Sequence, residues 1–263
     1  MGKARDQEWR SLLADYSDIV LVANSDEVDI NVLVARYPET TLFIFFNKVY
    51  KVLKEPFKHK CLLFSRSGTT GANLVKSGKV SKVLEYFDKD SFLGVVNMTI
   101  GDREKPSPAA AFGGVDVRHL DLTEIFAPFY PSTSIPTSGF ALCFWLTTLQ
   151  IDAKVTLAGF SSKRSERYQV FDVHDWTFEQ VLLRLMYRKG KIDVIGREHS
   201  NRYARLVEHF PEYSADDVAL TADEVLAERL VNLSSIVDRL MHVTRFLRFI
   251  ERSFKKLTKK KPK

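Results

Sequence analysis

The sequence predicts an α/β domain built on a mostly parallel sheet, followed by a helical, basic extension. The first two-thirds of the chain alternates short apolar runs with amphipathic stretches, which is typical of strands and helices in a parallel sheet. The last forty residues instead carry a long helical pattern that ends in lysines. A length of 263 residues and a hydrophobic content of 45% are sufficient for a full core.

Each expected element follows from a local pattern. Short apolar runs predict strands at residues 19–23, 41–46, 61–64, 92–96, 154–159 and 191–195. Helical periodicity predicts helices at residues 27–36, 71–87, 139–149 and 176–189, the last of which ends before Gly190. The stretch from 101 to 136, rich in Pro and Gly, and the polar stretch after Gly159 are expected to form long loops.

A narrow apolar seam runs along the expected C-terminal helix. Its members are Leu226, Leu230, Leu233, Val237, Leu240 and Leu247, with Thr244 at the one weak position. Their alternating steps of four and three residues form a heptad-like repeat. The seam fits equally a homo-oligomer, in which copies of the chain pair, and packing within one chain.

Beyond Thr244 the helix becomes basic. Residues 245–263 carry a net charge of +8, whereas residues 1–244 carry −2. One face of this segment is apolar and the neighbouring stripe is basic, which suits an anionic membrane surface. The alternative is a helix that packs on its own domain and ends in a solubilising lysine tail. Nucleic-acid binding is not expected, because no stacking motif accompanies the basic segment.

Several common sites and compartments are excluded. Cys61 and Cys143 lie in apolar stretches without a CxxC partner, which favours reduced thiols in the cytoplasm. The charged N-terminus and the lack of an apolar window of ~18 residues predict neither a signal peptide nor a spanning helix. GxGxxG, GxSxG and HExxH are missing from the sequence. Asp88-Lys89-Asp90 is expected at a solvated helix end and not at a metal site.

The segment richest in information is Thr137-Ser138-Gly139, which precedes an apolar run at 140–146 and a further apolar run at 155–159. A turn of small residues that opens an apolar helix presents backbone N–H groups and two hydroxyls at the helix N-terminus. This arrangement predicts a site for a phosphate or a carboxylate.

These segments resemble bacterial sialyltransferases that build lipo-oligosaccharide. The similarity is carried by Ile-Pro-Thr-Ser-Gly at 135–139, by the Val-Thr-Leu-Ala-Gly-Phe strand, and by His174 before the helix at 176–189. More loosely, Leu-Val-Ala-Asn-Ser at 21–25 resembles the first strand and Gly-Asn-Gly loop of that family, and Phe-Ile-Phe-Phe-Asn at 43–47 its second strand. The resemblance covers roughly residues 18 to 196. It implies a single Rossmann-like nucleotide-binding domain that uses a CMP-linked acidic sugar without a metal and inverts the anomeric carbon.

The resemblance also assigns roles to individual residues. Asn24 and Asn47 would hold the ribose and phosphate of the donor, and Thr137 and Ser138, with Gly139 in the same turn, would meet the donor carboxylate. His174 would be the general base, since an imidazole titrates near working pH. Tyr168 would donate to the leaving phosphate, and Lys163 stands nearest to a second tyrosine of the family.

The chain departs from the family pattern at three places. Ala23 and Ser25 replace both glycines of the first loop, and Ser65-Arg66-Ser67 lacks the asparagine found there in the family. Lys163 replaces the second tyrosine that acts on the leaving group. These differences leave sialic acid and Kdo both open as the donor sugar.

Together these observations predict an inverting glycosyltransferase that needs no cofactor and no metal. Residues 1–200 would form the nucleotide-sugar-binding domain, 201–244 a helical extension, and 245–263 a tail that binds the membrane. The acceptor would be a lipopolysaccharide, lipo-oligosaccharide or capsule precursor at the inner leaflet of the cytoplasmic membrane. The alternative is a non-catalytic nucleotide- or glycan-binding protein tethered by the same tail.

Overall fold

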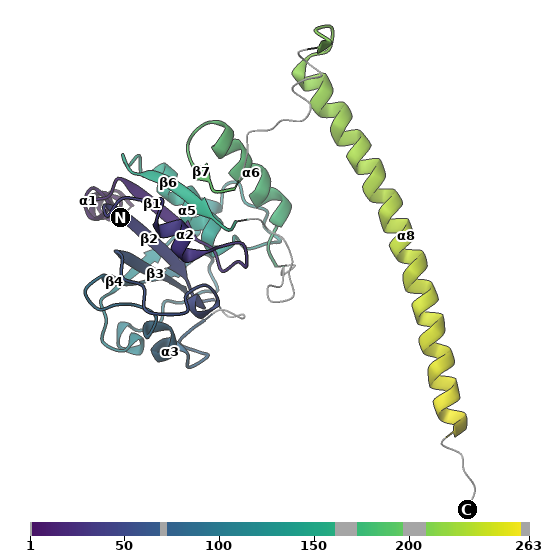
Figure 1. Ribbon diagram of the computed structural model, residues 1–263, viewed down its shortest axis with the longest axis horizontal. Coiled ribbons are helices and arrows are strands. Elements are labelled where there is room, and N and C mark those ends of the chain that lie inside the picture. Colours follow the sequence, from purple (N-terminus) through teal and green to yellow (C-terminus); the bar gives the residue numbers. More distant parts are fainter. Residues whose placement is uncertain (1, 69–72, 161–172, 197–208, 259–263) are drawn as a thin grey trace, which may run out of the picture. The chain divides into compact units, whose positions relative to one another are not determined.

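The computed structural model describes residues 2–68, 73–160, 173–196 and 209–258. The chain divides into two compact units, Met1–Arg197 and Glu198–Lys263. The first unit carries the sheet and the second carries one long helix (Figure 1). The prediction of separate segments at 201–244 and 245–263 remains a prediction.

In the described part of the chain, seven strands form one sheet in which every neighbouring pair is parallel. The strand order is β5-β4-β3-β2-β1-β6-β7. The strands are β1 (Asp18–Val22), β2 (Thr41–Phe46), β3 (Cys61–Arg66), β4 (Phe92–Thr99), β5 (Val117–Asp121), β6 (Lys154–Ala158) and β7 (Asp193–Val194). The predicted α/β class with a parallel, Rossmann-like sheet is confirmed.

Helices cover both faces of this sheet, which explains why its central strands are apolar throughout. In β2, Leu42 and Ile44 point into one core, whereas Phe43 and Phe45 point into the other. Residues of α1 (Gly2–Leu13), α4 (Thr123–Phe126), α5 (Ser138–Thr148) and α6 (Trp176–Arg188) contribute to the first core, and residues of α2 (Ile30–Val34), η1 (Val49–Lys51), α3 (Val80–Leu84) and η2 (Ala109–Phe112) to the second. The domain therefore has three layers (Figure 1).

Two expected helices are much shorter than their sequence patterns predicted. The helix expected at 27–36 is reduced to α2, because Asp29 caps its first turn by accepting hydrogen bonds from Asn31 N and Val32 N. The helix expected at 71–87 is reduced to α3. Residues 74–78 form turns, and the left-handed φ of +61° at Gly78 interrupts any helix there.

One strand and several helices of the structure were not predicted from the sequence. The stretch from 101 to 136, expected to be a loop, contains β5 as well as η2 and α4. β5 is an edge strand whose central residues, Arg118 and His119, are polar, so it lacks the apolar run used to recognise strands. Helix α1 was not predicted either, because the charged N-terminus lacks an apolar helical pattern.

Helix α1 is anchored to the core by one aromatic side chain. Trp9 is 4% exposed, and its ring meets Trp145 of α5 edge-on at 5.3 Å between centroids. The next residue, Arg10, donates from Nε to the carbonyl of Leu149 at 2.7 Å. Helix α1 therefore packs against the C-terminal end of α5.

The second unit contains α8 (Ala215–Thr258), 44 residues long. Figure 1 shows it as a continuous helix, and its backbone has no break at Thr244. Among the described residues, this helix and all others lack an apolar stretch long enough to cross a membrane.

We expect Trp9→Ala to lower the free energy of unfolding by about 3–5 kcal/mol, because the change removes a buried indole and leaves a cavity against Trp145. Chemical denaturation monitored by circular dichroism measures this. The control is Glu8→Ala, whose side chain is exposed on the same helix and should change stability by no more than about 0.5 kcal/mol. Equal stability of the two variants would contradict the anchoring role of Trp9.

Candidate functional site

The strand order changes direction at β1, which lies between β2 and β6. In open parallel sheets, ligands bind at such a point, outside the carboxyl ends of the strands. Here Ala23 N donates to Ala158 O at 2.9 Å, which holds the two strand ends together. Gly159 follows with a φ of +77°, and a Cβ at this position would lie 2.5 Å from Val28 Cγ2. The backbone therefore passes closely at the switch point only because residue 159 is a glycine.

Asn24 and Asn47 follow β1 and β2 at this edge, as the sequence predicted. Asn24 Nδ2 donates to Phe46 O at 2.8 Å, and Asn47 Oδ1 accepts from Arg66 N at 3.1 Å. Asn47 has a left-handed φ of 41°, a conformation that asparagine tolerates better than most residues. Within the described residues, the other amide atom of each side chain, Asn24 Oδ1 and Asn47 Nδ2, has no hydrogen-bond partner. Those two atoms are available to a ligand.

The turn of small residues begins α5, as the sequence predicted. Thr137 is the N-cap, with extended backbone, and its Oγ1 accepts from Phe140 N at 3.3 Å. A Cβ at Gly139 would lie 2.4 Å from Phe160 Cε1, so a larger residue would have to displace that ring. In the described structure, the N–H groups of Ser138 and Gly139 and the Ser138 hydroxyl lack hydrogen-bond partners. These groups form the free part of the helix N-terminus.

The backbone N–H and the hydroxyl of Thr137 already donate hydrogen bonds to a buried carboxylate that was not predicted from the sequence. Glu179 of α6, 2% exposed, accepts from Thr137 N and from Thr137 Oγ1, each at 2.6 Å. Tyr130 donates its hydroxyl to the same carboxylate at 2.9 Å. Burial raises the pKa of Glu179, and its hydrogen bonds to Thr137 and Tyr130 oppose that shift. Since the Thr137 hydroxyl both donates to Glu179 and accepts from Phe140, the adjacent Ser138 is the hydroxyl left for a bound anion.

Arg66, at the end of β3, is the second missed residue. It is 7% exposed, and its Nε donates to Glu104 at 2.8 Å while Nη1 donates to the carbonyl of Pro136 at 2.5 Å. The guanidinium therefore holds the turn that begins α5 against the end of β3. Next to it, Asn97 of β4 donates to Ser65 O at 2.9 Å.

His174 lies just before α6 and is held in one orientation. Its Nδ1 lies 2.6 Å from the carbonyl oxygen of Ile135. A carbonyl can only accept, so Nδ1 carries the proton and Nε2 presents a lone pair in the neutral ring. Burial lowers the pKa of His174, and the charge of Arg66 lowers it further, against the opposing hydrogen bond to Ile135. These are the properties required of a general base.

Hydrogen bonds connect most of the predicted site residues along one edge of the sheet. Asn24 contacts the end of β2, Asn47 contacts Arg66, and Arg66 contacts the turn that contains Thr137. His174 contacts the same turn through Ile135, two residues before Thr137. Tyr168 and Lys163 lie outside the described residues, so their predicted roles remain predictions.

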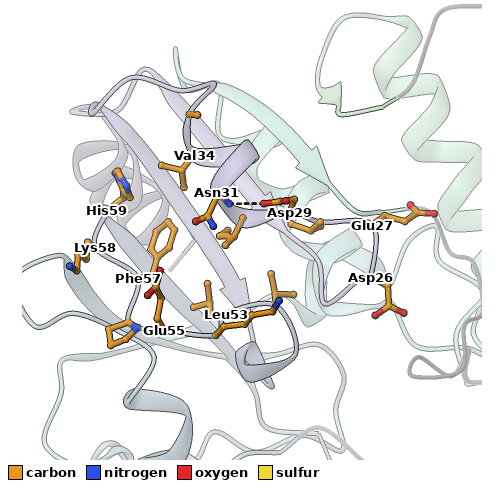
Figure 2. A pocket seen from close by; sticks show the side chains of 16 residues that line it. Asp26, Glu27, Asp29, Asn31, Val34, Leu53, Glu55, Phe57, Lys58 and His59 are labelled. Atoms are coloured by element: carbon orange, nitrogen blue, oxygen red, sulfur yellow. Dashed lines mark hydrogen bonds between the residues drawn. The ribbon is translucent and has the colours of Figure 1, made fainter.

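A separate pocket of about 870 Å³ lies on the α2 face of the sheet. Figure 2 shows its two sides, with Asp29 and Asn31 at the start of α2 and Phe57 and His59 on the segment that leads to β3. Acidic and basic side chains are mixed in its lining, which favours neither sign of ligand charge. None of the described site residues predicted from the sequence lines this pocket.

Across the described residues, no group of three or more His, Cys, Asp and Glu side chains could hold a metal ion. Comparison of the chain with protein-family models, with curated proteins and with solved structures gives no match. The assignment of function therefore depends on the residues at the sheet edge.

We expect Glu179→Ala to destabilise the first unit by about 2–4 kcal/mol, because it leaves the Thr137 N–H and the Tyr130 hydroxyl without an acceptor in a buried site. Thermal and urea unfolding measure this effect. Glu179→Gln should lose less, since its amide oxygen can still accept from Thr137. The exposed Glu124→Ala serves as control and should be nearly neutral. Wild-type stability of Glu179→Ala would show that the carboxylate does not hold the turn.

Proposed function

We propose that the chain is an inverting glycosyltransferase that moves an acidic keto-sugar, sialic acid or Kdo, from a CMP-linked donor. The acceptor would be a hydroxyl of a lipopolysaccharide, lipo-oligosaccharide or capsule precursor. The observation that carries the proposal is the hydrogen bond from His174 Nδ1 to Ile135 O. It fixes an imidazole with a free Nε2 and a lowered pKa on Ile135, three residues before the first residue of α5.

The proposed reaction is a single displacement. Nε2 of His174 takes the proton from the acceptor hydroxyl as that oxygen attacks the anomeric carbon. The bond from this carbon to the phosphate oxygen breaks, and its electron pair leaves with CMP. Attack and departure on opposite sides of the carbon give inversion.

The donor would bind along the sheet edge. Oδ1 of Asn24 and Nδ2 of Asn47 are suited to the ribose and phosphate, because both atoms lack partners among the described residues. The Ser138 hydroxyl and the N–H groups of Ser138 and Gly139 are suited to the sugar carboxylate. Thr137 would act on this carboxylate through the turn that it caps. Tyr168 and Lys163 would stabilise the leaving phosphate, with no metal ion and no other cofactor.

The basic end of the chain would bring the enzyme to its acceptor. We propose that residues 245–263 contact anionic lipids at the inner leaflet of the cytoplasmic membrane, where such glycolipid precursors are made. The net charge of +8 in this segment supports the proposal.

We expect CMP, CMP-sialic acid and CMP-Kdo to raise the melting temperature of the protein, whereas UDP and GDP leave it unchanged. A ligand at a hundred times its Kd stabilises a protein by about 2.7 kcal/mol, which a thermal-shift assay detects readily. The larger shift of the two CMP-sugars would identify the donor. Stabilisation by UDP or GDP without stabilisation by CMP would contradict the proposal.

We expect the purified protein to hydrolyse its CMP-sugar slowly, and His174→Gln to reduce that rate by about 10²- to 10⁴-fold while CMP binding persists. Only the neutral imidazole can accept a proton, so the wild-type rate should fall as the pH decreases. Burial lowers the pKa of His174, so the midpoint of this fall should lie below 6.5. Both effects are measured by monitoring the release of CMP by chromatography at a series of pH values.

The matched control is His119→Gln, because His119 is exposed on the edge strand β5 and should leave the rate and its pH profile unchanged. A protein that binds CMP without any hydrolysis, in wild type and variants alike, would instead be a non-catalytic binding module.

A further inference from the structure

The apolar seam of α8 is open to solvent within the second unit. Leu226, Leu230, Leu233, Val237 and Leu240 are each between 51% and 66% exposed. Ile236 and Met241, which flank the seam, are also about half exposed. A row of large apolar side chains on one face of a helix is rarely exposed to water, so this face is expected to bind a partner.

The spacing of the seam indicates what kind of partner it fits. A strict seven-residue repeat drifts by about 20° per heptad on a straight helix and stays on one line only when two helices supercoil. Three successive heptads keep the repeat, with leucines at 226, 233 and 240 and Leu230 and Val237 between them. The partner is therefore a second helix with the same repeat.

The charges of α8 change sign along its length. Residues 215–228 contain five acidic side chains and no Lys or Arg, whereas residues 245–258 contain five Lys and Arg and one acid. Two parallel copies would place acidic beside acidic and basic beside basic. Two antiparallel copies would place each acidic end beside a basic end, which is favourable.

We propose that α8 pairs with α8 of a second copy of this chain as an antiparallel coiled coil. In the register centred on residue 235, Leu233 faces Val237 of the second copy, Leu230 faces its Leu240, and Leu226 faces its Thr244. The same register brings residue 219 of one copy opposite residue 251 of the other. The pairing does not depend on the proposed catalytic activity. The four lysines at 259–263 follow in sequence the residues that this pairing uses.

The first test is the mass of the full chain in solution. Sedimentation equilibrium should give twice the chain mass of 30.1 kDa. Leu233→Lys should weaken the dimer by at least about 100-fold in Kd, because the symmetric pair contains the substitution twice. Val231→Lys is the matched control, since Val231 is 69% exposed on the same helix but lies off the seam, and it should leave the dimer intact. High salt should weaken an antiparallel dimer.

The second test fixes the orientation by oxidative cross-linking of full-length variants. A mixture of Ala219→Cys and Glu251→Cys chains should form a mixed disulfide, and Ala219→Cys alone should not. Within one helix these positions are about 48 Å apart, so only a second copy can link them. The native Cys61 and Cys143 are buried and serve as an internal background in the wild type.

Three results would overturn the proposal. They are a monomeric chain, a dimer in which Ala219→Cys cross-links to itself, and a Leu233→Lys variant that dimerises like the wild type. A monomer that sediments with phosphatidylglycerol vesicles, and is released by Leu233→Lys, would show that the seam faces lipid instead.

Discussion

The geometry of the sheet edge depends on the hydrogen bonds that the guanidinium of Arg66 donates. A buried cation is costly unless its partners are complete, and here Nε meets Glu104 while Nη1 meets the carbonyl of Pro136. The second oxygen of Glu104 accepts from Ile100 N at 2.8 Å, so the carboxylate is also satisfied. One side chain thereby joins the end of β3, the loop after β4 and the turn that begins α5.

That contact also sets the electrostatics of the neighbouring titratable groups. The positive charge of Arg66 lowers the pKa of His174 and opposes the rise that burial imposes on Glu179. The charge of Arg66 thus favours the neutral form of the imidazole and the ionised form of the carboxylate. Both effects favour the same arrangement, in which Nε2 of His174 can accept a proton and the Glu179 carboxylate accepts hydrogen bonds from Thr137. The sheet edge is accordingly organised before any ligand arrives.

The sequence was most informative where apolar runs are unbroken. The bounds of β2 were predicted without error, and those of β1, β6, α5 and α6 to within a residue. It failed where a polar pattern hides a packed element: α1 depends on the single indole of Trp9, and the edge strand β5 is mostly polar. Helix length was overestimated for α2 and α3, because local caps and turns ended helices that amphipathic spacing alone would have continued.

The same distinction applies to the site. Asn24, Asn47, Thr137 and His174 were predicted mainly from a family resemblance, and each stands after a strand or before a helix at the edge where parallel sheets bind ligands. Glu179 was not recognisable, because an acidic residue in the first turn of an amphipathic helix is normally solvated. Its partner is 42 residues away in sequence, and no local pattern encodes such a contact. Arg66 was missed for the same reason.

Arg66 and Glu179, which were not predicted from the sequence, change which groups of the site could bind a donor with two negative groups. Arg66 is paired with Glu104 and lies near the carboxyl group of Glu179, so its positive charge is already compensated within this cluster. These residues therefore organise the site without attracting an anion. Attraction would have to come from the unpaired N–H groups of Ser138 and Gly139 at the N-terminus of α5, and from cations outside this cluster. The proposed role of Lys163 would meet that requirement, because a site whose own arginine is neutralised needs positive charge from elsewhere to hold a carboxylate beside a phosphate.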